Sequence, residues 1–165
     1  MSRTWMTVAA VLGCALLVSA TASGVTDAKK QRIAIEVKQP LTAPKGKFVL
    51  DALTPGLLKI DTGSMTFTSG PTPVFSGRIV NGQRVDRFRG ATTLTSSLGT
   101  VALRLQVDFV SAGSGYQVGS GTWSVVSGTG QYAGLTGGGR SALVNPASGR
   151  FGFARYEGFV GRTTP

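Results

Sequence analysis

Apolar and polar residues alternate with a period of two along most of the chain from residue 32 onward. In residues 101–109 (VALRLQVDF) every second side chain is apolar, and the positions between them include Arg104, Gln106 and Asp108. Residues 32–39 (RIAIEVKQ) repeat the pattern. Such alternation is typical of antiparallel β-strands with one buried face.

Further strands are predicted wherever short β-prone runs lie between turn signals. Asn81-Gly82 is a strong signal for a two-residue hairpin turn, and Thr54-Pro55-Gly56 and Gly70-Pro71 mark other turns. No segment after Lys29 has a helical pattern, and glycine is frequent throughout. The additional strands are predicted at residues 47–53, 57–61, 64–69, 74–80, 84–94, 116–126, 139–144 and 150–160.

These strands predict an all-β fold in which a single antiparallel meander closes on itself. Without helices to cover a second layer, eight to ten short strands must pair as a sandwich or close as a barrel. A roughly eight-stranded β-barrel is favoured, and it forms one domain over residues 32–165. Residues 23–31 are expected to be a mobile leader.

The first 22 residues resemble a cleaved signal peptide rather than part of the fold. Arg3 supplies a positive start, residues 5–18 form an uncharged apolar run, and Ala20 and Ala22 give the small-residue pattern of a cleavage site. The apolar run is shorter than the roughly 20 residues that span a bilayer. We therefore expect cleavage after Ala22, an extracellular or periplasmic location, and no transmembrane segment in the mature chain.

Cys14, the only cysteine, offers an alternative reading of this segment. Residues 11–14 (VLGC) loosely resemble a lipoprotein box, in which Cys14 would carry a lipid anchor. The bulky Leu12 and the apolar residues that continue to Val18 favour the ordinary cleavage instead. In that case the mature chain has no thiol nucleophile and no disulfide.

The charge of the chain is strongly positive. The formal net charge is +10, and because only Arg3 would leave with residues 1–22 while all seven acids stay, the mature chain would carry +9. An exported protein of this charge is expected to bind anionic wall polymers, lipid headgroups or polysaccharides, and not nucleic acid. The alternative is a solvated basic surface that serves solubility only.

A glycine-rich segment, residues 127–141 (SGTGQYAGLTGGGRS), raises the question of phosphate binding. Its second half fits the spacing of a P-loop, except that Arg140 replaces the lysine. A P-loop also needs a following helix, whereas this chain reaches Pro146 and a turn within a few residues. We therefore interpret the segment as a turn between strands, with Tyr132 and Leu135 packed inward.

Three glycines of this segment are expected to have structural roles. Gly128, Gly130 and Gly134 would supply positive φ angles or a close backbone approach where the barrel wall bends. Their spacing also differs from that of the dinucleotide-binding fingerprint.

Residues 119–140 (GSGTWSVVSGTGQYAGLTGGGR), which follow the strand GTVALRLQV, resemble a signature of bacterial secreted proteins. That signature, G-x-W-x-V-x-x-G-T-G-x-Y-A-G-L-x-G-x-G, belongs to the allene oxide cyclase barrel-like and dirigent-like superfamily. The resemblance is dense from about Gly99 to Arg140 and only topological elsewhere. It implies an eight-stranded antiparallel barrel with an apolar cavity, and a tendency to form homo-oligomers. No functional residue of the plant members maps onto a position of this chain.

The residue types present exclude several kinds of active site. The chain has no histidine, so a Ser-His-Asp triad, a Cys-His pair and a histidine-bound zinc ion are excluded. No loop clusters acidic oxygens, so we expect no calcium site, and no cofactor is indicated. The remaining carboxylates are too scattered for spacing alone to pair them: Asp51, Asp61, Asp86, Asp108 and Glu157.

Residues 150–160 (RFGFARYEGFV) contain the first candidate site. Phe151, Phe153, Arg155, Glu157 and Phe159 share one strand face. If this face points into the barrel, it places a charge pair among phenylalanines, where Glu157 would have a raised pKa and a small apolar ligand could bind. The alternative is that Arg155 and Glu157 meet solvent near the rim.

The second candidate site is a basic patch. Arg87 and Arg89 share a face of one predicted strand and Arg84 lies near the hairpin, so the three could join Lys45 and Lys47. Scattered, solvated arginines are the alternative.

Three functions are consistent with the sequence. The favoured one is an exported, non-catalytic barrel that binds a small apolar ligand in its cavity, an anionic envelope surface through its basic residues, or both. The alternatives are a cavity enzyme of the cyclase or dirigent type, and a structural or adhesive envelope protein. A large interior void would favour a ligand or an enzyme, and a filled interior a surface role.

Overall fold

The computed structural model describes residues 30–68, 74–146 and 150–162. The predicted signal peptide, most of the predicted leader, and the turn at residues 70–71 lie outside these ranges. The described part contains nine strands and one short 3-10 helix. They are β1 (Gln31–Pro40), β2 (Lys45–Ala52), β3 (Asp61–Thr68), β4 (Val74–Val80), β5 (Gln83–Ser96), β6 (Gly99–Ser111), β7 (Tyr116–Gly128), η1 (Gly130–Tyr132), β8 (Leu135–Pro146) and β9 (Phe151–Arg162).

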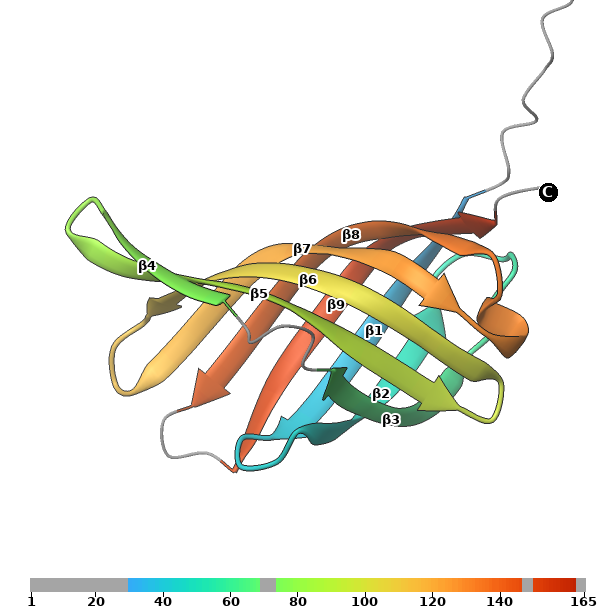
Figure 1. The fold of residues 1–165 in the computed structure, drawn as a ribbon, viewed down its shortest axis with the longest axis horizontal. Helices are drawn as coiled ribbons and strands as arrows, with labels where there is room; N and C mark the ends of the chain where they lie inside the picture. Colours follow the sequence, from blue (N-terminus) through green and yellow to red (C-terminus); the bar gives the residue numbers. More distant parts are fainter. Residues whose placement is uncertain (1–29, 69–73, 147–149, 163–165) are drawn as a thin grey trace, which may run out of the picture.

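The strands form a closed antiparallel barrel (Figure 1). Neighbours follow the order β3-β2-β1-β9-β8-β7-β6-β5-β4, and an additional pairing of β3 with β5 closes the ring. Eight strands therefore make the wall, since β4 lies outside the ring. This confirms the predicted all-β barrel.

β4 and the first half of β5 form an arm that extends beyond the barrel (Figure 1). β4 pairs with β5 from Gln83 to Arg89, whereas β3 pairs with β5 from Ala91 to Thr95. Asn81 and Gly82 connect the arm's strands with φ angles of 50° and 76°. Both angles are positive, as a two-residue hairpin turn of this type requires, so the hairpin prediction is confirmed.

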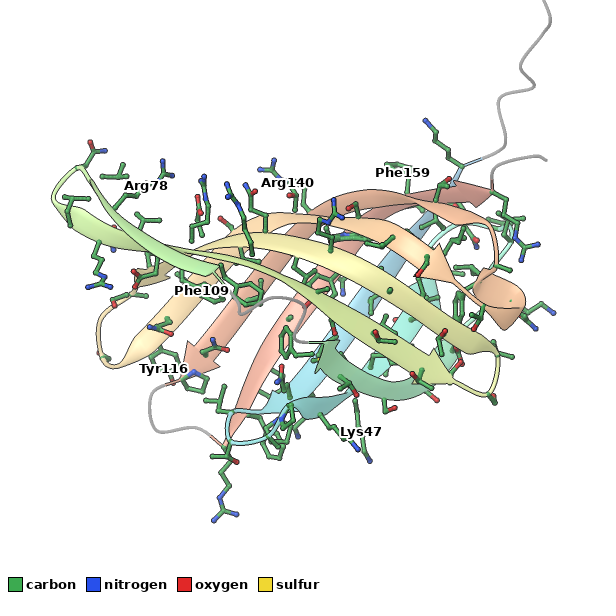
Figure 2. The ribbon with its side chains drawn as sticks, viewed as in Figure 1. Lys47, Arg78, Phe109, Tyr116, Arg140 and Phe159 are labelled. Carbon is green, nitrogen blue, oxygen red and sulfur yellow. The ribbon has the colours of Figure 1, made fainter. Side chains whose placement is uncertain are left out.

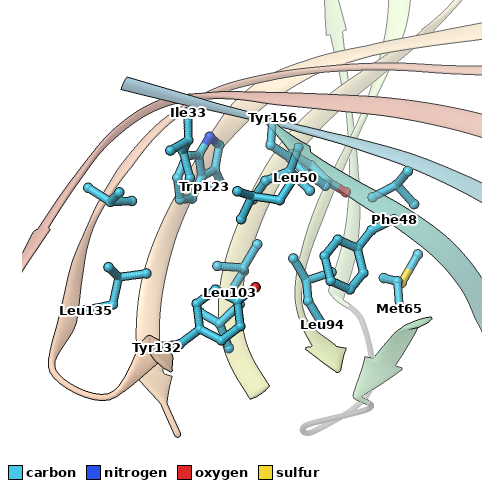
Figure 3. Close-up of a cluster of buried hydrophobic side chains, with 14 of the residues drawn as sticks. Ile33, Phe48, Leu50, Met65, Leu94, Leu103, Trp123, Tyr132, Leu135 and Tyr156 are labelled. Carbon is cyan, nitrogen blue, oxygen red and sulfur yellow. The ribbon is translucent and has the colours of Figure 1, made fainter. Parts of the chain in front are cut away.

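The large apolar side chains of the wall fill the barrel interior (Figure 3). The inner face of β6 is the one predicted from alternation: Val101, Leu103, Leu105 and Val107 are all buried. Side chains from every part of the ring pack with them. The core includes Ile33, Ile35, Phe48, Leu50, Met65, Leu94, Trp123, Tyr132, Leu135, Tyr156 and Val160.

One end of the barrel, which we call the plugged end, is covered by η1 and by the segment 53–60. The sequence predicted a strand at residues 57–61, but only Asp61 belongs to one, and Leu58 instead packs into the core. Gln31, which the sequence placed in the leader, is the first residue of β1 and is fully buried. Its side-chain amide donates to the Thr54 and Leu58 carbonyls at 2.9 and 2.8 Å and accepts from the Leu58 N–H at 2.7 Å.

The other end, which we call the hollow end, is where β1, β6 and β8 end and β9 begins. A hollow of about 520 Å³ lies there. Its lining combines loop residues with the ends of β6, β7 and β8: Leu41, Ser111, Gly113, Gly115, Tyr116, Gln117, Asn145 and Pro146.

Candidate binding surface

The glycine-rich segment is a turn, as interpreted from the sequence. It runs from β7 through η1 into strand β8, so no helix follows it, and Arg140 is an exposed residue of β8. Tyr132 and Leu135 are buried. This geometry gives no helix N-terminus for a phosphate group.

The three glycines behave as expected. Gly130 and Gly134 have φ angles of 59° and 69°. A Cβ atom added to Gly128 would lie 2.1 Å from the Tyr132 carbonyl oxygen, so a side chain there would displace the backbone.

The first candidate site required the phenylalanine face of residues 150–160 to point into the barrel, and this condition is not met. Phe151, Phe153 and Phe159 are 36%, 52% and 53% exposed on the outer face of β9, whereas Tyr156 and Val160 are buried in the core. The phenylalanines therefore do not line an interior cavity with Arg155 and Glu157.

Close packing of backbones explains why the other face of β9 points inward. This face carries Gly152, Ala154, Tyr156, Gly158 and Val160. A Cβ atom on Gly158 would lie 2.2 Å from the carbonyl oxygen of Gly138 on the neighbouring strand. The small residues accommodate the tight wall and leave interior volume for the large rings of Trp123 and Tyr156.

Arg155 and Glu157 belong to an ion-pair network on the outer face. Arg155 pairs with Glu36 on β1, and its Nε also lies 3.5 Å from Glu157 Oε2. Arg32 donates a short hydrogen bond to the Glu157 carboxylate. This network crosses β1 and β9, and it matches the alternative in which the pair meets solvent.

The pKa of Glu157 moves in the direction opposite to the one predicted for an interior site. The hydrogen bond from Arg32 lowers it below its usual range, with smaller contributions from the charges of Arg32 and Arg155. The pKa of Asp108 is lowered in the same way, mainly by its hydrogen bond from Arg87.

These lowered pKa values predict a loss of stability in acid. A carboxyl group whose pKa is lower in the folded than in the unfolded state stabilises the fold above its unfolded pKa, and this contribution is lost as the pH falls through the folded pKa. We expect Glu157→Gln to lower the melting temperature at neutral pH, and the difference from wild type to disappear between about pH 5 and pH 3. Thermal melts across this range measure the effect; a difference that stays constant with pH would contradict it.

The three arginines of the predicted basic patch are largely engaged with neighbours. Arg87 donates two hydrogen bonds to Asp108, at 2.6 and 2.7 Å, and Arg84 lies 2.9 Å from Asp86. Arg89 donates to the side chain of Gln106 at 3.3 Å. Lys45 and Lys47 do not join them, because these lysines lie on β2, on the other side of β3 from β5.

Lys45 and Lys47 form a different cluster with Lys38, on the outer face at the hollow end. Lys38 and Lys47 are directly opposite each other in the β1–β2 ladder. Lys45 is the first residue of β2 and precedes Lys47 by two positions. All three side chains are exposed. The cross-strand neighbours of the cluster on β3 and β9 are uncharged, namely Ser64, Thr66 and Phe153.

The aromatic rings of β9 complete this cluster. The Lys38 ammonium lies 4.5 Å from the ring centre of Phe151 and 5.8 Å from that of Phe153. We call these five residues the lysine–phenylalanine surface: Lys38, Lys45, Lys47, Phe151 and Phe153. In Figure 2, Lys47 lies on the opposite side of the barrel from Arg140 and Phe159.

The sequence contained the signal for this surface. In the pattern of residues 31–52, Lys38, Lys45 and Lys47 all occupy outward positions, and the short turn at 41–44 sets the register of the hairpin. Phe151 and Phe153 can be assigned to the same surface only when it is known which face of β9 points outward.

In residues 30–68, 74–146 and 150–162, no three histidine, cysteine, aspartate or glutamate side chains lie close enough together to hold a metal ion. Across the same ranges, no helix is long and apolar enough to cross a membrane.

Comparisons with protein-family models, with curated proteins and with solved structures find no match to this chain.

Proposed function

We propose that this protein is a non-catalytic binding protein that attaches to an anionic surface through the lysine–phenylalanine surface. The observation that carries this proposal is the position of Lys38 directly opposite Lys47. Like charges directly opposite each other destabilise a sheet. The Lys38–Lys47 pair therefore lowers the stability of the free protein. A bound anion would offset this repulsion, which gives the arrangement a functional reason.

The lysines of this surface differ from half of the ten described arginines in lacking an ion-pair partner. Arg32, Arg78, Arg84, Arg87 and Arg155 all form ion pairs. Within the described part of the chain, no carboxylate lies within ion-pair distance of Lys38, Lys45 or Lys47. Their charge is therefore available to a ligand outside the protein.

Removal of the three lysine charges tests this proposal. Each lysine near an anionic membrane surface contributes about 1 kcal/mol. Changing Lys38, Lys45 and Lys47 together to glutamine should therefore weaken binding to polyphosphate or to anionic vesicles by about 100-fold at low salt. For the wild type, binding should fall as the salt concentration rises and the Debye length shrinks below about 8 Å.

A charge-matched variant serves as the control. Replacing Arg84, Arg87 and Arg89 by glutamine removes the same formal charge from β5. If this variant loses as much affinity as the lysine variant, net charge alone governs binding and the proposed surface is wrong. Melting temperatures of both variants show whether each one is folded.

A small apolar ligand at the hollow end is the second candidate function. The hollow of about 520 Å³ supports it, because the Gln117 and Asn145 amides lie beside the apolar Leu41 and Tyr116 in its lining. The packed core leaves this end, rather than the barrel centre, as the place for such a ligand. Native mass spectrometry of protein purified from culture medium would detect a co-purifying molecule.

Export of the chain and membership of the allene oxide cyclase barrel-like and dirigent-like superfamily remain part of the proposal. The signal-like segment at residues 1–22 supports export to a location with anionic polymers and lipids. The closed eight-stranded barrel agrees with the fold that the resemblance implies. N-terminal sequencing of exported protein should give a start at or near Ser23, whereas a lipidated Cys14 would indicate the lipoprotein alternative.

A further inference from the structure

A row of apolar side chains runs from the arm across the outer face of the barrel and ends at the lysine–phenylalanine surface. Each member is directly opposite the next in the ladders between β5 and β9. The row begins buried at Val85, is half-buried on β6 and β7, and is exposed at its last two positions. Its members are Val85, Val110, Val118, Val144 and Phe153.

A second apolar row lies beside the first, at the rim of the hollow end. Tyr116 is opposite Pro146 on β8, and Phe151 is opposite Pro40 on β1. Tyr116, Phe151 and the neighbouring Leu41 are all exposed. The outer wall at this end therefore presents apolar side chains on consecutive strands, with lysines beside them.

The chemistry of these two rows favours a lipid bilayer over a polymer. An anionic polymer is bound through its charged and hydrogen-bonding groups, and the aliphatic valine and proline side chains of the rows offer it neither. Aromatic and aliphatic side chains beside lysines are typical of protein surfaces that lie at a membrane interface. A second copy of the chain would bring the lysines of both copies together, which like-charge repulsion opposes.

We infer that the anionic surface is a lipid bilayer, and that Phe153, Val144 and the rim side chains enter its interfacial layer while the three lysines contact anionic headgroups. This inference rests on the proposed function, because the same lysines supply the electrostatic attraction. It adds that apolar side chains contribute to binding and that the hollow end faces the membrane.

Two phenylalanines of β9 provide a matched pair of variants. Phe153 and Phe159 lie on the same outer face, and their exposed fractions are 52% and 53%. Phe159 is at the plugged end, opposite Arg32, which is paired with Glu157. Serine at either position removes a ring of equal exposure, but only Phe153 belongs to the proposed membrane-facing surface.

The test measures the partition of full-length wild type, Phe153→Ser and Phe159→Ser onto vesicles of equal parts phosphatidylglycerol and phosphatidylcholine. Binding to polyphosphate is measured in parallel. We expect Phe153→Ser to lower vesicle partition by about tenfold, because burial of apolar area is lost, and to lower polyphosphate binding by much less, because the three lysine charges remain. Phe159→Ser should match the wild type in both assays.

The outcomes separate the inference from the proposed function. Equal vesicle partition of Phe153→Ser and Phe159→Ser would overturn the bilayer inference. Polyphosphate binding without vesicle binding by the wild type would also overturn it, in favour of an anionic polymer. Failure of the wild type to bind either ligand would overturn the proposed function itself.

Discussion

Replacing Gly130 with alanine is expected to cost about 3 kcal/mol of unfolding free energy. Gly130 has a φ angle of 59°, in the left-handed region that alanine adopts only with strain. An added Cβ atom would lie 2.3 Å from the carbonyl oxygen of Leu98, which is part of the backbone and cannot rotate away. The Leu98 carbonyl also accepts the Gln131 N–H at 2.8 Å, so moving it disturbs the turn.

Gly113 offers a matched control, because it shares the backbone strain without the steric conflict. Its φ angle is 79°, and an added Cβ atom would have no neighbour within 4 Å. Gly113→Ala should therefore cost only about 1 kcal/mol. Urea unfolding of both variants measures the difference, and equal costs would mean that the contact with Leu98 does not constrain the turn.

Replacing Tyr132 with alanine is expected to have the largest effect, about 3–5 kcal/mol. Tyr132 is buried at the plugged end, packs into the core (Figure 3), and donates a short hydrogen bond to the buried Asp61 carboxylate. Burial and this bond raise the pKa of Tyr132. Truncation would leave a cavity and would also remove the donor from Asp61.

Tyr132→Phe separates these two contributions. It keeps the ring and removes only the hydroxyl group, so we expect a cost of about 1–3 kcal/mol for leaving a buried acceptor without its donor. Tyr132→Phe should thus fall between wild type and Tyr132→Ala in urea unfolding. If Tyr132→Phe were as stable as the wild type, the bond to Asp61 would not contribute to closing this end.

The period-two pattern predicted the strands well but not the facing of β9. On β6 the apolar residues alternate with polar and charged ones, so only one face can be buried. On β9 both faces contain apolar residues, so alternation alone left the facing of this strand open. Gly158 marks the inward face, because an added Cβ atom there would meet the backbone of the neighbouring strand β8.

Two features depend on pairing between distant segments, which alternation alone does not encode. The ring closes because β3 pairs with the second half of β5, and this leaves β4 with the first half as a protruding arm. The lysine–phenylalanine surface likewise requires β9, near the end of the chain, to pair with β1. By contrast, the turn at Asn81-Gly82 and the buried Tyr132 and Leu135 could be predicted because local residues determine them.

Hydroxyl-radical footprinting of the protein bound to phosphatidylglycerol-containing vesicles tests the central claim most directly. The method reports how strongly each exposed aromatic side chain is oxidised in the free and in the bound protein. We predict that oxidation of Phe153, Phe151 and Tyr116 decreases on binding, whereas oxidation of the equally exposed Phe159 does not change. Protection of Phe159 without protection of Phe153 would show that another face binds the membrane and would contradict the account.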